Sequence, residues 1–200
     1  MEFIDTSYRS DNSNSGNGVS LAQKLAQLHT TLAPIPLGYQ QPMFGWPTAT
    51  YCGSTRQANA LCASWAKFFT DNRLLAVLQL IDESHGTDEE LRAGVETVVQ
   101  KVVPRLLRNG HLGGRRGIMP VLVHGDLWMG NRVCGKIASC SGAEELTFDP
   151  SVCYAHSEFE LGIMRMFGGF SAGFFHEYHR LVPRTEPKRE YEDRIRLYQL

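Results

Sequence analysis

The chain contains 200 residues, of which 42% are hydrophobic and 20% are charged, as is typical of a soluble globular protein. Its net charge of −1 provides no positive field for nucleic acid or an anionic membrane. No apolar run approaches the roughly 20 residues of a membrane-spanning helix, and the first residues lack a signal-peptide pattern. The 5 cysteines lack C-x-x-C spacing, which favours free thiols over a zinc site. We therefore expect a cytoplasmic protein, whose oligomeric state the sequence leaves open.

The N-terminal part predicts one helix after a polar loop. Residues 1–5 form a short apolar and acidic run, and residues 6–19 are rich in Ser, Asn, Asp and Gly, which predicts a flexible loop. Ser20 has the features of an N-cap for a helix that ends near His29, with leucines on one face. A histidine at the end of an amphipathic helix is more often a hydrogen-bonded core residue than a ligand. We therefore expect His29 in the core.

The middle of the chain predicts two long helices after an irregular connection. Residues 37–60 alternate Gly, Pro, Thr and Tyr, which favours loops or a small β-excursion. Helical periodicity follows over residues 61–82 and again over 89–108, where Pro104 should disturb the last turn. The Gly-rich residues 110–117 could suggest a phosphate-binding loop. However, no strand precedes them and no helix follows, so they predict a surface loop.

The stretch that carries chemistry follows a buried strand, predicted over residues 118–123. The strand leads into a polar loop with a carboxylate at Asp126 and a carboxamide at Asn131. A hairpin over residues 132–148 then delivers a second carboxylate, Asp149. One acid to hold an attacking hydroxyl and two oxygen donors for Mg²⁺ suit phosphoryl transfer from a nucleotide.

The C-terminal part predicts further helices. Ser157 and Glu160 match a capping box that opens a helix, and Glu160 is expected to act only as the capping partner. Gly168 and Gly169 interrupt this helix, an aromatic run follows, and a last helix begins near Glu190. The predicted class is α+β, mainly helical, with one small catalytic β-hairpin.

Three motifs resemble the fructosamine/ketosamine 3-kinase family, which is related to the aminoglycoside and choline kinases and shares the protein-kinase-like fold. They are His-Gly-Asp-Leu-Trp-x-Gly-Asn at 124–131, Phe-Asp-Pro-x-x-x-Tyr-x-His-x-Glu-x-Glu-Leu at 148–161, and Met-Phe-Gly-Gly-Phe at 166–170. The resemblance covers essentially the whole chain. It implies a hinge remnant at 1–5, a flexible loop at 6–19 and the C-terminal lobe of the fold at 20–200, with the N-terminal lobe absent and the C-terminus truncated.

Two positions depart from the protein-kinase motifs of the same fold. Protein kinases have His-Arg-Asp followed by Asp-Phe-Gly, whereas this chain has Gly125 in place of Arg and Pro150 in place of Phe. These departures favour a kinase for small molecules over one for protein hydroxyls.

By the resemblance, the reaction is ATP-dependent phosphorylation of the 3-hydroxyl of ketosamines, ribulosamine or fructosamine, which promotes deglycation. The substrates would be glycated proteins or small ketoamines, and the cofactors ATP and Mg²⁺. Asp126 would accept or orient the hydroxyl hydrogen. Asn131 and Asp149 would hold the metal.

The resemblance assigns supporting roles to further residues. His124 and Gly125 are expected to support the loop structurally. Trp128 could stack on the sugar or only wedge the loop, and both alternatives stay open. His156 and Glu158 are expected to line the substrate side, although the helix N-terminus would also explain an acid at Glu158.

The nucleotide would also meet the first residues of the chain. If residues 1–5 form the hinge, the backbones of Glu2 and Phe3 would bind adenine. Two alternative functions remain: a noncatalytic truncated pseudokinase that binds without turnover, and a kinase for another small alcohol. The intact motif argues against the first, and Trp128 with the Phe-Gly-Gly-Phe segment at 167–170 argues against the second.

Overall fold

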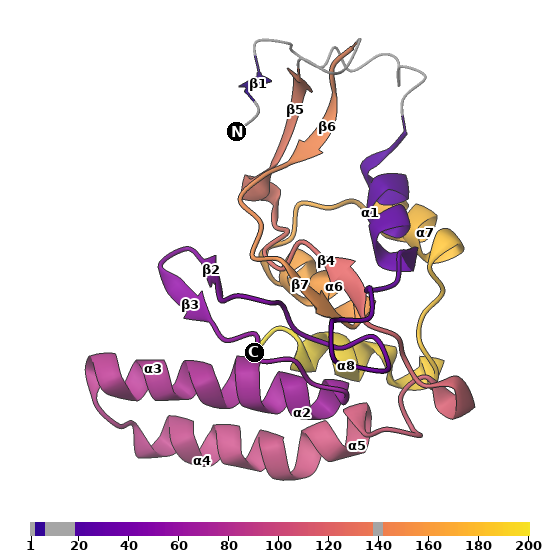
Figure 1. The fold of residues 1–200 in the computed structure, drawn as a ribbon. Helices are drawn as coiled ribbons and strands as arrows, with labels where there is room; N and C mark the ends of the chain where they lie inside the picture. Colours follow the sequence, from indigo (N-terminus) through magenta and orange to yellow (C-terminus); the bar gives the residue numbers. More distant parts are fainter. Residues whose placement is uncertain (1–2, 7–18, 138–141) are drawn as a thin grey trace.

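The computed structural model describes residues 3–6, 19–137 and 142–200. Glu2 and nearly all of the expected flexible loop at 6–19 therefore lie outside the described residues. Within them, the chain forms eight α-helices and three small antiparallel sheets (Figure 1). The predicted α+β class with mainly helical content is confirmed.

One small sheet stands at one end of the molecule, beyond the helices (Figure 1). It has the strand order β1-β5-β6, with bounds β1 Ile4–Asp5, β5 Arg132–Ile137 and β6 Glu144–Thr147. The β5–β6 register pairs Arg132 with Thr147, so the hairpin closes where the polar loop ends. The predicted hairpin over 132–148 is confirmed.

The centre of the molecule is a two-stranded sheet with a helix behind it. Strand β4 (Val121–Val123) pairs with β7 (Cys153–Ala155), and α6 (Ser157–Phe167) follows β7 directly. Strand β4 is shorter than the predicted 118–123, because Pro120 has no backbone N–H to donate to a ladder. The buried side chains of both strands place the loop after β4 over the core.

Three further helices pack around this centre. Helices α1 (Leu21–Thr30) and α7 (Ala172–Leu181) lie side by side (Figure 1), and α8 (Tyr191–Leu197) packs against α6. The predicted N-cap is confirmed: the Ser20 hydroxyl accepts from the Gln23 N–H, and the Gln23 side chain accepts from the Ser20 N–H. His29 is buried and bonded to the Tyr178 hydroxyl at 2.7 Å, which confirms its place in the core.

The two predicted long helices form an antiparallel pair (Figure 1). Each contains a π-helical segment in its middle. The first consists of α2 (Trp65–Phe69), the π-helical segment Thr70–Leu75 and α3 (Ala76–His85). The second consists of α4 (Glu89–Thr97), the π-helical segment Val98–Val102 and α5 (Val103–Leu107). The second π-helical segment ends at Val102, two residues before Pro104. A proline cannot donate to the preceding turn and its ring crowds that turn, so the predicted disturbance occurs one turn early.

The connection before these helices contains a short hairpin of β2 (Thr50–Cys52) and β3 (Thr55–Gln57), as the small β-excursion predicted. Below it, Trp65 lies at the centre of an aromatic core and donates from Nε1 to the Tyr198 hydroxyl at 2.8 Å. None of the helices in the described parts of the chain has the length and apolar character needed to cross a membrane.

Candidate active site

The polar loop after β4 passes close to the chain that follows β6. Gly125 has φ +83°, and a Cβ atom there would lie 2.1 Å from the carbonyl oxygen of Ser151. Only glycine adopts this conformation without strain and allows this approach. The close packing of this loop against Ser151 therefore requires glycine at position 125. The loop places Asp126 at the edge of the core, where 9% of the residue is exposed.

Asp126 and Asn131 are bonded to each other. The Asn131 side-chain nitrogen donates to the backbone carbonyl of Asp126 at 2.8 Å and to its carboxylate at 3.2 Å. A short 3₁₀ turn, Met129–Asn131, makes this reach possible. At the base of the hairpin, the Phe148 N–H donates to the Asn131 carbonyl at 3.1 Å. The hairpin thereby returns the chain to Asn131 immediately before Asp149.

Asp149 has φ +56° and is the only non-glycine residue with positive φ in the described parts of the chain. Aspartate tolerates this left-handed conformation better than most residues, at a cost of about 1 kcal/mol. Burial raises the pKa of Asp126, hydrogen bonds from Cys52 and Asn131 and the charge of His124 oppose this, and the charge of Asp149 raises the pKa further. The two carboxylates are thus close enough to interact.

The donors present fit a magnesium ion. The side-chain nitrogen of Asn131 faces Asp126, so its side-chain oxygen is the remaining donor, and the Asp149 carboxylate provides another. Mg²⁺ prefers hard oxygen ligands and usually takes one or two from protein, with water and phosphates completing the shell. Among the described residues there is no cluster of three or more His, Cys, Asp or Glu side chains that could hold a metal.

His124 connects the loop to the segment that carries Asp149. Its Nδ1 accepts from the Asp126 N–H at 3.3 Å, so Nε2 carries the proton and donates to the Phe148 carbonyl at 3.0 Å. These bonds join His124 to the backbone of Asp126 and to that of Phe148, the residue before Asp149. The histidine thereby holds the two segments together.

The role predicted for Glu160 from the sequence is wrong. The expected capping box is wrong: α6 begins after His156 without a side-chain cap, and Glu160 points inward with 0% exposure. Its carboxylate accepts backbone N–H groups of His124, Gly125 and Leu127. The available signal was its neighbourhood: an acid directly before Leu161, on the apolar face of the helix, needs buried partners.

Cys52 was also missed. The β2–β3 hairpin places its thiol beside the Asp126 carboxylate. Burial raises the pKa of Cys52 to about 11, and the negative charges of Asp126 and Asp149 act in the same direction. The thiol therefore keeps its proton at neutral pH. No local pattern in the sequence connects this hairpin to the loop.

Trp128 lies between the loop and the end of α6. Its ring is tilted against Phe167 at a centroid distance of 5.4 Å, and a Cβ on Gly130 would come within 2.2 Å of the indole. The indole therefore lies flat across the backbone of Gly130, yet 38% of the residue stays exposed. Both a wedging role and contact with a ligand are compatible with this position.

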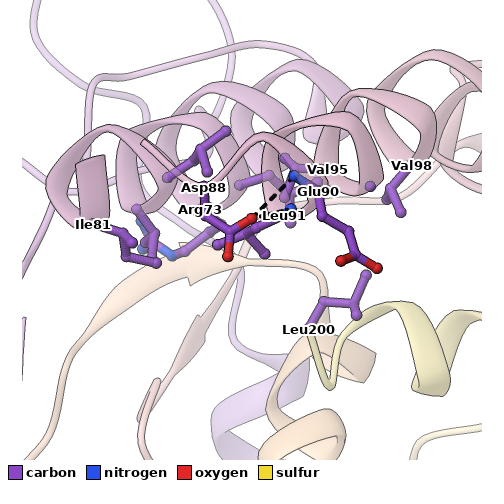
Figure 2. Close-up of a pocket in the computed structure, with 12 residues that line it drawn as sticks. Arg73, Ile81, Asp88, Glu90, Leu91, Val95, Val98 and Leu200 are labelled. Carbon is purple, nitrogen blue, oxygen red and sulfur yellow. Dashed lines mark hydrogen bonds between the residues drawn. The ribbon is translucent and has the colours of Figure 1, made fainter. Parts of the chain in front are cut away.

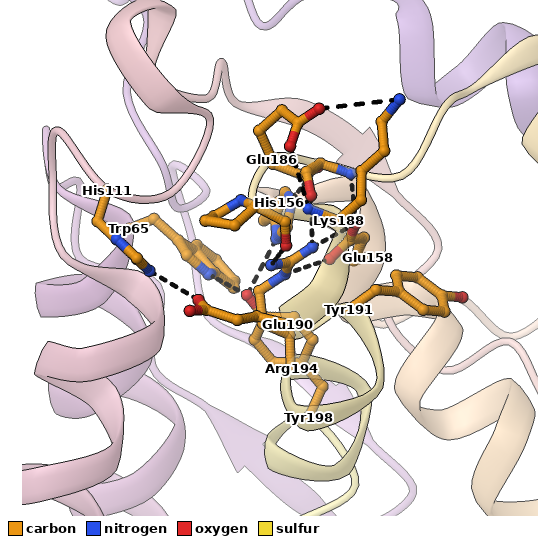
Figure 3. A network of polar contacts seen from close by, with 12 residues as sticks. Trp65, His111, His156, Glu158, Glu186, Lys188, Glu190, Tyr191, Arg194 and Tyr198 are labelled. Carbon is orange, nitrogen blue, oxygen red and sulfur yellow. Dashed lines mark hydrogen bonds and ion pairs between the residues drawn. The ribbon is translucent and has the colours of Figure 1, made fainter.

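The structure does not bring His156 and Glu158 to Asp126. Both are 2% exposed and belong to a buried network near the C-terminus (Figure 3). His156 bonds the hydroxyls of Tyr198 and Thr185 at 2.9 Å each. Glu158 pairs with Arg194 at 2.7 Å. The expected substrate-side position is therefore corrected to a structural one, because neither side chain offers surface to a substrate.

The charges in this network follow from its burial. Burial lowers the pKa of His156 to about 4. Burial alone would raise the pKa of Glu158, but His156 and Arg194 outweigh it and hold this pKa below its usual range. The network therefore contains a neutral histidine and an ionised pair.

Of the two expected adenine contacts, only Phe3 is described. Its side chain is 81% exposed, and the next residues, β1, pair with the end of β5. The structure thus places this backbone at the edge of the small sheet.

A cavity of about 580 Å³ lies between α3, α4 and the C-terminal Leu200, with mostly apolar walls, and neither Asp126 nor Asp149 lines it (Figure 2). A smaller cavity of about 200 Å³ adjoins Cys52, Gly125 and Ser151, directly beside the loop.

The whole chain, residues 1–200, matches the family model described as "Fructosamine kinase". It is 36% identical over 157 residues to the ketosamine-3-kinase of Mus musculus, covering 78% of this chain and 45% of that protein. It is 32% identical over 200 residues to the chloroplastic protein-ribulosamine 3-kinase of Arabidopsis thaliana, covering 100% of this chain and 53% of that protein. The chain thus spans about half the length of these relatives.

Solved structures agree. The chain resembles a protein of Haemophilus somnus 129PT assigned as a fructosamine-3-kinase, with a TM-score of 0.67, 25% identity and coverage of 89% of this chain and 51% of the other. A counterpart from Thermobifida fusca gives a TM-score of 0.66 at 25% identity, covering 89% and 54%. The resemblance inferred from the three motifs is confirmed, and the chain belongs to the fructosamine kinase family.

Proposed function

We propose that this chain carries the catalytic loop of an ATP-dependent ketosamine 3-kinase and forms the C-terminal lobe of its protein-kinase-like fold. The observation that carries the proposal is the meeting of Asp126, Asn131 and Asp149 at the end of β4 and the base of the hairpin. Two acids and an amide oxygen at one place suit a hydroxyl acceptor and a metal-bound nucleotide.

In the proposed reaction, the oxygen of the substrate 3-hydroxyl attacks the γ-phosphorus of ATP. The bond between that phosphorus and the β,γ-bridging oxygen breaks, ADP leaves, and the hydroxyl proton passes to Asp126 and then to water. An ionised carboxylate is a weak base toward an alcohol, so Asp126 acts mainly by orienting the hydroxyl, with late proton transfer.

The other residues position the reactants. Asn131 and Asp149 would hold Mg²⁺, which neutralises phosphate charge when bound. His124 keeps the two loops together, and Gly125 allows their close approach. The exposed part of Trp128 is available to stack on the sugar of the ketoamine. We also propose that the segment around Phe3 forms the hinge to the remainder of the kinase, where its backbone, with that of Glu2, would contact adenine.

The substrates of the relatives suggest the acceptor. A ketosamine-3-kinase and a protein-ribulosamine 3-kinase are similar to this chain. We propose that the acceptor is a ribulosamine or fructosamine, borne by a glycated protein or a small amine.

The test is ADP release by the protein at its full native length, supplied with ATP, Mg²⁺ and a ribulosamine- or fructosamine-bearing protein. ADP formation that depends on the ketoamine, and that is lost in Asp126→Asn, supports the proposal. Binding without ADP formation would show a noncatalytic module. ADP formation only with an aminoglycoside or choline would assign a different acceptor. Either of the last two results overturns the proposal.

A further inference from the structure

The backbone of the catalytic loop is held from behind by one carboxylate. Glu160 accepts from the Gly125 N–H at 3.1 and 3.2 Å and from the Leu127 N–H at 3.4 Å, and it also accepts from the His124 N–H. Three amides of a four-residue stretch therefore converge on one side chain. Such convergence occurs only when the loop has one particular backbone conformation.

The one amide that Glu160 does not bind belongs to Asp126. That N–H donates to His124 Nδ1, and the Asp126 side chain meets Asn131. The loop thus turns its flanking amides toward Glu160 and its reactive side chain toward the metal-binding residues. A loss of the Glu160 contacts would release this arrangement without removing any reactive group.

Two other helices bring a histidine beside the Glu160 carboxylate. His29 of α1 has its Nε2 3.8 Å from Glu160, and its Nδ1 lies 2.7 Å from the hydroxyl of Tyr178 on α7. Burial raises the pKa of Tyr178 far above its usual range, so the hydroxyl keeps its proton, and its hydrogen bond with Nδ1 fixes the orientation of the imidazole. In this orientation Nε2 of His29 faces Glu160 and has no hydrogen-bond partner among the described residues.

Glu160 remains charged in this interior. Burial alone would raise its pKa, but the neighbouring imidazoles of His29 and His124 and the hydrogen bond from the Gly125 N–H outweigh burial and hold the pKa below its usual range. A carboxylate that accepts several N–H groups is stronger as an acceptor than a neutral group.

From this geometry we infer that Glu160 is a positioning residue for phosphoryl transfer: through its bonds to three loop amides it keeps the loop in the conformation that directs Asp126 to the acceptor hydroxyl. The catalytic part of this inference rests on the proposed function, but the anchoring of the loop by Glu160 can be measured separately. Glu160 touches no reactant, so its effect on catalysis passes entirely through the loop.

The chain provides a matched control. Glu158 lies on the same helix turn and is buried to a similar degree, but it binds Arg194 and the Thr185 N–H instead. A glutamine at 160 offers one acceptor oxygen and turns an NH₂ group toward backbone donors. A glutamine at 158 disturbs only the C-terminal network. Comparing Glu160→Gln with Glu158→Gln therefore separates loop anchoring from general loss of buried charge.

The first measurement is amide hydrogen exchange in the 200-residue chain, which needs no catalysis. In Glu160→Gln we expect exchange at His124, Gly125 and Leu127 to accelerate about tenfold or more, the equivalent of losing one hydrogen bond of about 1.4 kcal/mol. In Glu158→Gln we expect faster exchange at Thr185 and an unchanged loop. Equal exchange of the three loop amides in wild type and Glu160→Gln overturns the inference.

The second measurement is kcat and KM in the full-length protein, per folded molecule. We expect Glu160→Gln to lower kcat about 100-fold, as misplacement of reacting groups does, with KM for ATP nearly unchanged. Glu158→Gln should stay within about threefold of wild type. Equal kcat losses in both variants would reduce Glu160 to a structural role and overturn the inference.

If Glu160→Gln does not fold, Glu160→Asp decides, because it keeps the charge and withdraws it by one methylene. We expect Glu160→Asp to accelerate hydrogen exchange of the loop amides and to lower kcat, each by less than Glu160→Gln would. Wild-type exchange rates together with a wild-type kcat would overturn the inference. A wild-type protein that forms no ADP with ketoamines overturns the proposed function instead, and the exchange result still decides whether Glu160 anchors the loop.

Discussion

Two polar groups meet at the start of α6 and differ in how their charges are balanced. The C-terminal network, defined as His156, Glu158, Thr185, Arg194 and Tyr198, pairs its acid with a buried arginine and leaves its histidine neutral. The proposed catalytic group, defined as His124, Asp126, Asn131, Asp149 and Glu160, contains two carboxylates, Asp126 and Asp149, that influence each other. Neither Asp126 nor Asp149 forms a salt bridge with a residue in the described parts of the chain.

This difference separates a structural cluster from a reactive one. A buried charge that is paired with an opposite charge in the protein needs no external ion to balance it. Two acids without a basic partner are a place for a cation, and partial exposure gives that cation access. Burial of polar residues alone therefore does not indicate a site, and the balance of charge is more informative.

The largest effect should come from the reactive acids. Asp126→Asn removes the group that orients the acceptor, and we expect activity to fall by about 1,000-fold or more. Asp149→Ala should do the same by removing a metal ligand. Both variants should unfold at temperatures close to wild type, since each relieves repulsion between carboxylates. ADP release and thermal unfolding check this, and normal turnover by either variant would remove that residue from the mechanism.

The network should show the opposite response. Arg194→Met leaves the Glu158 charge buried without a partner, so we expect the free energy of unfolding to fall by about 3–5 kcal/mol. Arg165→Met is the matched control, because the Arg165–Glu192 pair is exposed and should contribute less than about 1 kcal/mol. Denaturant unfolding measures both. A similar small change in both variants would remove the distinction between the buried and exposed pairs.

Part of the pH dependence of the free energy of unfolding should come from His156 in the C-terminal network. His156 has a pKa of about 4 in the folded chain, against an ordinary value near 6.5. The unfolded chain therefore binds a proton first, and stability is lost as pH falls from about 6.5 to about 4, by up to about 3 kcal/mol. His156→Gln should be less stable at pH 8 but should show a shallower loss over this window. Parallel pH profiles for the two proteins would contradict the assignment.

A smaller effect should come from the β2–β3 hairpin. Cys52→Ala removes one hydrogen bond from Asp126, and we expect kcat to fall about tenfold, which corresponds to about 1.4 kcal/mol. Cys52→Ser keeps a donor and should recover part of the loss. Cys62→Ala, which replaces a cysteine of similar burial outside the catalytic group, should match wild type. Turnover of Cys52→Ala equal to that of Cys62→Ala would show that the thiol does not help position Asp126.

Features that depend only on neighbours along the chain could be predicted from the amino-acid sequence. Asp126 and Asn131 are five positions apart in one loop, and a hairpin must return near its start, so their meeting with Asp149 followed from spacing and turn geometry. The Ser20 cap and the helical stripes are likewise local. The three motifs that indicated the kinase family also lie within these local elements.

Which side chains face inward, and which distant partners they bind, depends on how the elements pack in three dimensions. Glu160 and Glu158 are two residues apart on one helix, and nothing local separates the one that holds the catalytic loop from the one that pairs with Arg194. Cys52 reaches Asp126 from a distant hairpin. The physical reason is that a buried carboxylate takes whichever donors the packing of other elements brings to it, and that packing depends on the whole chain.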